Sequence, residues 1–230
     1  EVQSFFAGAT FGYKDFLFLE GTLRRDQSST LPADNNSYYY PAVSGSYLFS
    51  NNLNIPFIKF GKLRANWAQI GNDTNFDRIN DTYTALTSFQ GNAAAAVSNS
   101  KKNPDLKPEI SRSYEVGLEM RFLEKANVGF DIGFLNGRGN FSLDLYQKLT
   151  TDLLLEVPVP DTNGGGVTIE NVGEVKNYGY DVTLGYDIIS SEDFNWSSNF
   201  TLSYTRYEVT NLFDGLEEVE GQFAVPGGQA

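Results

Sequence analysis

The side chains available for chemistry in this 230-residue chain are carboxylates and hydroxyls, because it contains no cysteine and no histidine. Thiolate nucleophiles, imidazole bases, disulfides and the usual ligands of transition metals are therefore excluded. The best-placed acids are Glu115 and Glu119, which precede Arg121 in a segment that alternates polar and apolar residues. On one face of a strand these two carboxylates stand about 13 Å apart, too far for acid–base catalysis without a partner strand. The pattern favours a polar wall or a ladder of salt bridges.

Two other stretches resemble ligand sites only superficially. Asp73, Asp77 and Asp81 lie in an oxygen-rich segment, but their spacing does not match a known calcium loop. Three glycines at 164–166 are not followed by the Lys-Ser/Thr pair of a phosphate-binding loop. We interpret these stretches as a solvated loop and a flexible loop tip, and we expect no metal and no cofactor.

Charge and composition narrow the class of protein further. The chain carries 29 acidic and 17 basic residues, a net charge of −12, and the basic residues are scattered, which argues against nucleic-acid binding. It contains 18 Phe, 13 Tyr and 22 Gly but 1 Met. This balance favours strands and tight turns over helices, so an all-β fold is expected.

Eight segments alternate apolar and polar residues with the period of a strand. The longest uninterrupted apolar run has five residues, Ala93–Val97. That run is far shorter than the roughly 20 residues of a membrane helix, whereas a barrel strand needs only about 9–11. We predict strands near Phe5–Tyr13, Phe16–Gln27, Tyr38–Phe49, Lys59–Gly71, Arg112–Phe122, Phe141–Thr150, Glu174–Ile188 and Asn195–Glu208.

The connections between these strands alternate in length, as they do in outer-membrane barrels, where short turns face the periplasm and long loops face outside. Short turns are expected at 13–15 and 190–194, and a modest connection at 51–58. The stretch Leu123–Asn140 is interpreted as a long strand end or a hairpin extension. Eight strands fit either a small complete barrel or a section of a large one. The long loops are expected near Ser28–Ser37, Asn72–Ser111 and Thr151–Gly173.

Several motifs then carry a family resemblance. The sequence from Asn103 to Glu109, NPDLKPE, is followed by SYEVGL from Ser113 to Leu118. This pair resembles a signature of TonB-dependent outer-membrane transporters. Further segments, in the same order and spacing, resemble the SusC/RagA branch found in Bacteroidetes; they lie at 24–29, 40–44, 63–72, 151–154 and 171–179.

The resemblance implies that residues 1–230 are a section of an antiparallel transmembrane β-barrel of about 22 strands, the size class of plugged transporters. It also implies an outer-membrane, non-enzymatic importer of an oligosaccharide or a peptide. A SusD-like surface lipoprotein would cap its outward face. TonB would supply energy through a plug region that is absent from these 230 residues.

On this interpretation the apolar strand faces contact outer-membrane lipid, and the polar faces line the lumen. The predicted lumen-lining residues are Glu20, Thr22, Arg24, Arg64, Asn66, Glu115, Glu119, Arg121, Asp181 and Thr183. The loop residues predicted to meet substrate or the lid are Tyr38, Tyr39, Asn72, Asp73 and Tyr83. For the tyrosines, the favoured alternative is an aromatic girdle that anchors the barrel at the level of the lipid headgroups. Pro104, Pro108, Gly173 and Gly179 have structural interpretations instead: extended, non-donating rim residues for the prolines, and a bulge or close backbone approach for the glycines.

Two other classes of protein are also compatible with the sequence. A secreted or surface β-sandwich that binds glycans through aromatic loops would bury the same apolar residues between two sheets. A carboxylate-dependent glycoside hydrolase would need two acids facing each other across a cleft.

Overall fold

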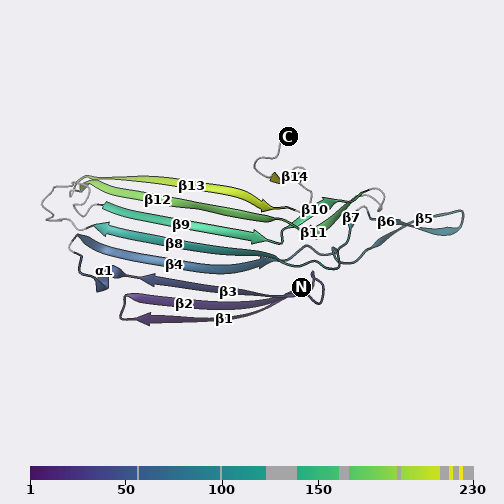
Figure 1. The fold of residues 1–230 in the computed structure, drawn as a ribbon, viewed down its shortest axis with the longest axis horizontal. Coiled ribbons are helices and arrows are strands. Elements are labelled where there is room, and N and C mark those ends of the chain that lie inside the picture. Colours follow the sequence, from purple (N-terminus) through teal and green to yellow (C-terminus); the bar gives the residue numbers. More distant parts are fainter. Residues whose placement is uncertain are drawn as a thin grey trace.

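The computed structural model describes residues 1–55, 57–98, 100–122, 139–160, 166–190 and 193–212, with the strand backbone at 218–219 and 223–224. Its main feature is an eight-stranded sheet in which every strand runs antiparallel to its neighbours and follows them in chain order (Figure 1). The strands are β1 Val2–Tyr13, β2 Leu17–Ser28, β3 Ser37–Tyr47, β4 Ile58–Asn72, β8 Glu109–Phe122, β9 Gly139–Thr151, β12 Glu174–Ser190 and β13 Asn195–Asn211. All eight predicted strands are confirmed, with ends that differ by a few residues.

Two ends of the sheet can be distinguished. The turn end carries the connection at 14–16, where Lys14 and Asp15 both have positive φ, and the short helix α1 Phe49–Asn52. The loop end carries the two longest connections, at 73–108 and 152–173, and their small sheets (Figure 1). The predicted alternation of short and long connections is only partly present, because the loop-end connection at 29–36 is shorter than the turn-end connections at 48–57 and 123–138.

The long connections are folded, which corrects the prediction of plain loops at Asn72–Ser111 and Thr151–Gly173. Hairpin β5 Tyr83–Phe89 and β6 Asn92–Val97 turns at Gln90 and Gly91, whose positive φ values suit a two-residue hairpin turn. In the second connection, buried Leu155 and Val157 alternate with exposed Glu156. These strands are short, which hid them in the sequence. The remaining short strands are β7 Ser100–Lys101, β10 Leu154–Pro158, β11 Val167–Asn171, β14 Glu218–Val219 and β15 Phe223–Ala224.

A second correction concerns the end of the third strand, which stops at Tyr47 instead of continuing to Phe49. Phe49 begins α1, and its ring lies over Gly61, where an added Cβ would come within 2.1 Å of it. Within the described ranges, no helix is long and apolar enough to cross a membrane. The prediction for 123–140 falls mostly outside the described residues, although β9 already begins at Gly139.

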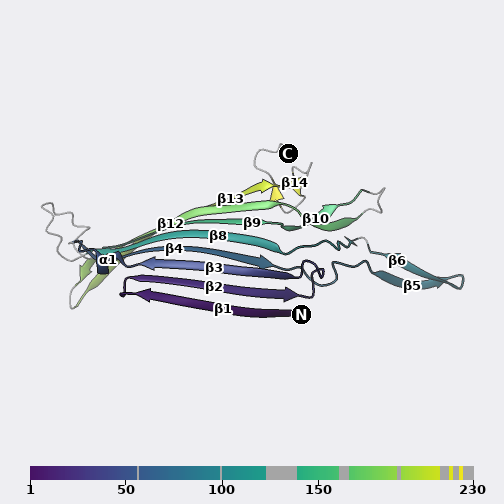
Figure 2. The same ribbon diagram turned by 60° about the horizontal axis from the view of Figure 1, so that its bottom comes forward.

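The sheet is a single curved layer with one apolar and one polar face (Figure 2). Cross-strand partners share a face, so the register assigns Leu63, Leu118 and Leu143 to one row of the apolar face. Side chains on that face stay open: Phe11 is 56% exposed and Phe200 is 59% exposed. The buried apolar residues of the described chain are instead few, and most of them lie at the loop end: Leu31, Tyr38, Leu106, Phe122, Leu155, Val157 and Ile169.

This distribution contradicts the sandwich hypothesis, because no second sheet covers the apolar face within the described residues. It also selects between the two barrel possibilities. The strand order begins at β1 and ends at β13, and among the described strands each of these two has one partner in the sheet. The sheet is therefore an open section and not a closed eight-stranded barrel.

Candidate functional site

All ten residues predicted to line a lumen lie on the polar face. The register shows this directly: Glu20 pairs with Ser44, Ser44 with Asn66, and Asn66 with Glu115. A neighbouring row connects Arg64 to Asp181 through Gly117 and Asp144. The other members follow by the two-residue alternation along the same strands: Thr22, Arg24, Glu119, Arg121 and Thr183.

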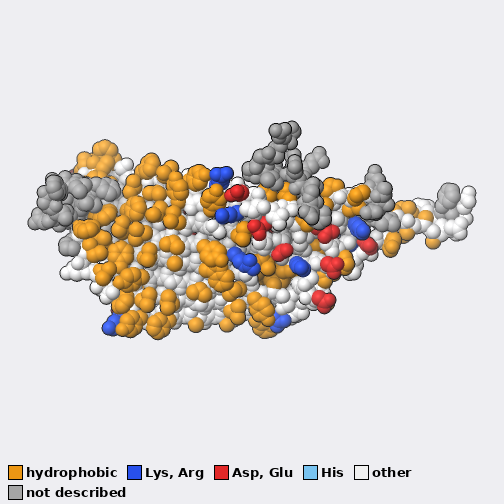
Figure 3. Space-filling view, in the orientation of Figure 1, with side chains coloured by type: hydrophobic (Ala, Val, Ile, Leu, Met, Phe, Trp, Pro, Cys, Tyr) orange, Lys and Arg blue, Asp and Glu red, His pale blue; other side chains and the backbone are white. Residues whose placement is uncertain are grey.

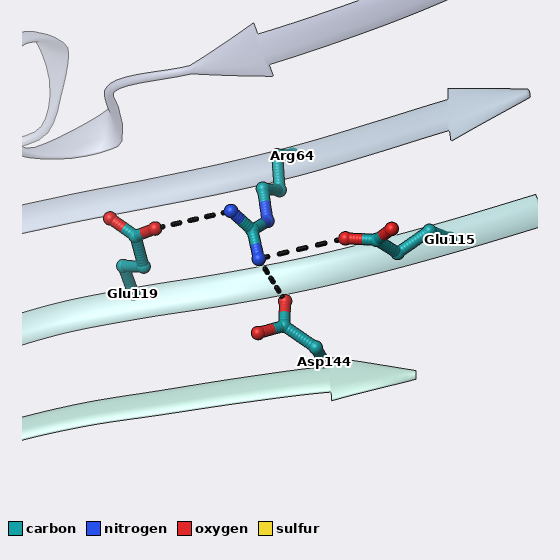
Figure 4. Close-up of polar contacts among 4 residues, drawn as sticks. All are labelled: Arg64, Glu115, Glu119 and Asp144. Atoms are coloured by element: carbon teal, nitrogen blue, oxygen red, sulfur yellow. Dashed lines mark hydrogen bonds and ion pairs between the residues drawn. The ribbon is translucent and has the colours of Figure 1, made fainter. Parts of the chain in front are cut away.

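Arg64 is the centre of an ion-pair cluster on this face (Figure 4). Its Nη2 atom lies 2.6 Å from Oδ1 of Asp144 and 3.6 Å from Oε1 of Glu115, and its Nη1 atom lies 3.4 Å from Oε1 of Glu119. The guanidinium of Arg64 therefore lies between Glu115 and Glu119 and bridges these two residues of β8. The polar wall and salt bridges predicted here are present, with the ion pairs gathered around Arg64, and both acids face an arginine on an open wall instead of each other across a cleft.

Gly117 makes this arrangement possible. It lies on β8 between Arg64 of β4 and Asp144 of β9. A Cβ atom at this position would lie 2.3 Å from both the Nε atom of Arg64 and the Oδ1 atom of Asp144. A glycine is therefore needed for the guanidinium to cross β8. The sequence prediction missed both Gly117 and Asp144, although Asp144 stands in a polar position of its alternating strand.

The cluster is held loosely compared with a buried site. Three carboxylates and one guanidinium give these four side chains a formal charge of −2, and the Arg64 and Glu119 side chains are each 34% exposed. Ion pairs this open typically contribute about 0–1 kcal/mol each. The buried Nε atom of Arg64 has no hydrogen-bond partner within the described part of the chain. The arrangement can shape a water-facing wall and keep it negative.

A second site, the loop-end cluster, is tightly packed and consists of Leu31, Tyr38, Leu106 and Ile169 with their hydrogen-bonded surroundings. Leu106 is fully buried. Asn171 joins two distant loops: its Oδ1 accepts a 2.7 Å bond from the N–H of Lys107, and its Nδ2 donates to the carbonyls of Lys107 and Asp152 at 2.8 and 2.9 Å. Asn103 donates to the carbonyl of Ile169 at 3.0 Å. Three of the motifs that carry the family resemblance, at 103–109, 151–154 and 171–179, therefore meet at this cluster.

The predictions for the two glycines are confirmed. Gly173 has a φ of +98° next to a bulge, and a Cβ at Gly179 would lie 2.1 Å from the carbonyl oxygen of Tyr204. Pro108 leads directly into β8. The expected extended approach is wrong at Pro104, which lies in a turn because the N–H of Asp105 donates to Oδ1 of Asn103 at 2.9 Å.

The five predicted loop-contact residues lie in different environments. Tyr38 is 9% exposed within the loop-end cluster, whereas Tyr39 is 53% exposed on the apolar face beside Arg25. Tyr83 is 70% exposed on the β5–β6 hairpin. Asn72 and Asp73 both form side-chain hydrogen bonds at the loop end. Asn72 donates to the Glu109 carboxylate at 3.2 Å, and Asp73 accepts from the Thr30 hydroxyl at 3.1 Å.

The oxygen-rich segment forms no metal-binding group in the described chain. Asp77 pairs with the Nζ atom of Lys102 at 3.3 Å, and Asp81 accepts a 3.2 Å bond from the N–H of Lys102. Asp73 belongs to a separate contact with Thr30. Among the described residues, no group of three or more acidic side chains is arranged so that it could hold a metal ion.

Comparisons with known proteins agree with this architecture. TonB-dependent receptor P26 of Formosa agariphila is 28% identical over 223 residues, which are 92% of this chain and 21% of that protein. TonB-dependent receptor SusC of Bacteroides thetaiotaomicron is 28% identical over 204 residues, 84% of this chain and 19% of SusC. The chain therefore spans about a fifth of the length of these relatives.

Solved structures give the same result. The RagAB peptide transporter matches with a TM-score of 0.79 and 26% identity, over 94% of this chain and 23% of the matched chain. The profile of the family described as TonB dependent receptor-like, beta-barrel, matches residues 1–226. The resemblance read from the motifs is confirmed, and it places the sheet in the outer membrane, in a class of receptors and not of enzymes. The chain belongs to the TonB-dependent receptor β-barrel family and is a SusC/RagA-like section of its barrel.

Proposed function

We propose that this chain forms part of the wall and the outward loops of a TonB-dependent importer for an oligosaccharide or a peptide. The polar face lines the lumen, and the loop end faces outside. A plug elsewhere in the complete protein receives energy from TonB, and a SusD-like lipoprotein closes the outward mouth. The protein performs no covalent chemistry on its cargo.

The observation that carries the proposal is the contrast between the two faces of one sheet. The apolar face has three successive rows without a charged residue, represented by Val116, Leu118 and Met120 on β8. The opposite face carries the Arg64 ion pairs. A wall with lipid on one side and water on the other requires this division.

The polar face also offers a place for a ligand. A hollow of about 240 Å³ is lined by residues that include Glu20, Arg64 and Asn66. Hydroxyl, carboxylate and amide groups of this kind bind the hydroxyls of a sugar or the amides of a peptide. RagAB is a peptide transporter, so peptides are one of the two cargo classes to test.

The β5–β6 hairpin is the proposed contact for the lid lipoprotein. It extends beyond the loop end (Figure 2). Tyr83 is 70% exposed and Leu86 is 53% exposed on this hairpin. Apolar side chains exposed on a projecting element are typical of a protein interface.

Uptake in the native bacterium tests the function. A strain that lacks the gene is restored with the wild-type gene, in cells with and without active TonB, and consumption of an oligosaccharide pool and a peptide pool is measured. We expect consumption of one pool to fall in the deletion strain and to return only when both the gene and TonB are present. Consumption of both pools at the wild-type rate without the gene would contradict the proposal.

A hairpin variant tests the lid contact separately. Tyr83→Ser together with Leu86→Ser in the complete protein removes exposed apolar area without touching the eight-stranded sheet. We expect less lipoprotein to co-purify, while the barrel keeps its heat-dependent gel mobility. Serine substitutions at two exposed apolar residues that lie at the turn end outside the strands, Leu53 and Phe194, serve as the control. Equal co-purification by both variants would contradict the lid contact.

A further inference from the structure

Four basic residues lie on the apolar face at its loop-end boundary, and we call them the basic belt: Arg25, Arg112, Lys176 and Arg206. The register places them there. Lys176 and Leu149 are cross-strand partners, Leu149 pairs with Arg112, and Arg206 pairs with Tyr178. Arg25 follows Leu23 by two residues on β2 and pairs with Tyr39. Figure 3 shows Lys and Arg side chains along the edge of a broad hydrophobic band, with Asp and Glu side chains beside them.

The position of the belt across the sheet is slanted. We define a row as a set of cross-strand partners on the apolar face, and Arg112 and Lys176 belong to the same row. Arg25 of β2 lies one row closer to the loop end, and Arg206 of β13 lies one row closer to the turn end. Strands of a membrane barrel are tilted by about 35–45°, so a membrane surface crosses the rows obliquely. Cations that lie at one membrane surface are therefore expected to form a slanted line across the rows.

Acidic side chains lie close to the belt (Figure 3), but among the described residues none of its four cations forms an ion pair. Lys176 contacts the ring of Tyr178 at 5.2 Å, and Arg25 contacts the ring of Tyr39 at 6.0 Å. Glu208 is the cross-strand partner of Lys176, yet within the described chain neither Lys176 nor Arg206 forms an ion pair. A cation beside hydrocarbon needs an anionic partner or water to offset its desolvation.

An apolar groove of about 490 Å³ lies next to these cations. Its lining on the apolar face includes Tyr114, Leu145, Tyr180 and Tyr204, and Lys176 contributes to its edge. A groove lined by aliphatic and aromatic side chains suits an acyl chain, and tyrosines are typical of the headgroup level of a membrane. Cation and groove together match the two parts of one lipid molecule.

We propose that the basic belt and this groove bind a phosphorylated lipid of the outer leaflet. The phosphate contacts Arg112, Lys176 and Arg206, and one acyl chain lies in the groove. The side chains of Arg and Lys form charge-assisted hydrogen bonds with phosphate oxygens, which gives the surface a preference for phosphorylated over uncharged lipids. The bound lipid fixes the position of this part of the barrel wall along the membrane normal.

Native mass spectrometry of the complete protein in detergent, titrated with monophosphoryl lipid A, tests this proposal. Arg112→Gln, Lys176→Gln and Arg206→Gln combined should weaken lipid binding by about tenfold or more, since each juxtamembrane cation contributes appreciably to anionic-lipid affinity. The matched control removes three cations from the polar face: Lys62→Gln, Arg121→Gln and Lys148→Gln.

Two outcomes would overturn the proposal. One is equal lipid affinity of the belt variant and the polar-face control. The other is wild-type affinity for the same lipid after removal of its phosphate, which would identify the groove as a non-selective apolar surface. Heat-dependent gel mobility of both variants verifies that each barrel is folded before binding is measured.

Discussion

The loop-end cluster and the Arg64 cluster differ in how firmly the chain holds them. At the loop end, Leu106 is fully buried and Asn171 satisfies three backbone groups. On the polar wall, Arg64 is about one-third exposed and its ion pairs face water. The comparison teaches that the family motifs serve two regions: those at 103–109, 151–154 and 171–179 build the rim of the sheet, whereas those at 63–72 and 113–118 supply residues of the more open wall.

The strongest test of this difference is Leu106→Ala. Truncation of a fully buried leucine should cost about 2–5 kcal/mol of folding free energy, because it leaves a cavity at the centre of the loop-end cluster. Denaturant unfolding of the complete protein in lipid vesicles measures the loss. Leu53→Ala at the turn end is the control, since Leu53 is 48% exposed, and a similar loss in both variants would contradict the assignment of a core to the loop end.

An asparagine pair separates structure from transport. Asn171→Ala should cost about 1–3 kcal/mol because it leaves backbone groups of Lys107 and Asp152 without a partner. Asn66→Ala on the polar wall should leave stability nearly unchanged and alter the uptake rate. Unfolding and uptake are measured for both variants, and a reversed pattern would show that the two regions have been assigned the wrong roles.

Gly117→Ala probes the crossing of Arg64 over β8. The new Cβ would lie 2.3 Å from two atoms of the ion pair, so the guanidinium must move away from Asp144, at a cost of about 1–3 kcal/mol. Gly21→Ala is the matched control, because nothing lies within 4 Å of a Cβ at Gly21. Equal thermal stability of the two variants would contradict the described packing of Arg64.

The smallest effect is expected for Arg64→Gln. Loss of partly exposed ion pairs should cost about 1 kcal/mol or less, and the three remaining carboxylates then repel each other. Because salt screens this repulsion, the deficit in melting temperature should shrink between low salt and about 1 M salt. A deficit of several kcal/mol that is independent of salt would mean that Arg64 is a buried structural residue.

The sequence predicts the strands and the division into two faces because both depend on the two-residue period. Alternation in β8 alone separates Glu115 and Glu119 from Val116 and Leu118. The alternation predicts neither which strands are neighbours nor the register between them. The contact of Arg64 with Asp144 therefore appears only in the structure. The short strands β10 and β11 were missed because five residues carry too little periodicity.

The sequence also does not predict which of two neighbouring tyrosines is buried. Tyr38 and Tyr39 are neighbours in a run of three tyrosines, and their types alone predict the same role for both. The strand places them on opposite faces, one inside the loop-end cluster and one exposed beside Arg25. Tyr38 is buried because it packs with Leu106 and Ile169, which come from loops distant in sequence and were not predictable as its neighbours.

Oxygen and water accessibility along the strands tests the central claim most directly. The chain has no cysteine, so single cysteines can be introduced into a complete protein with a cysteine-free background, spin-labelled and reconstituted in vesicles. Labels are placed on the apolar face at Val116, Leu118 and Leu145, and on the polar face at Ser113, Ser142 and Thr183. We predict collisions with lipid-dissolved oxygen for the first set and with a water-soluble nickel complex for the second. Similar accessibility of both sets, or protection of the first set from oxygen, would contradict a wall with lipid on one side and water on the other.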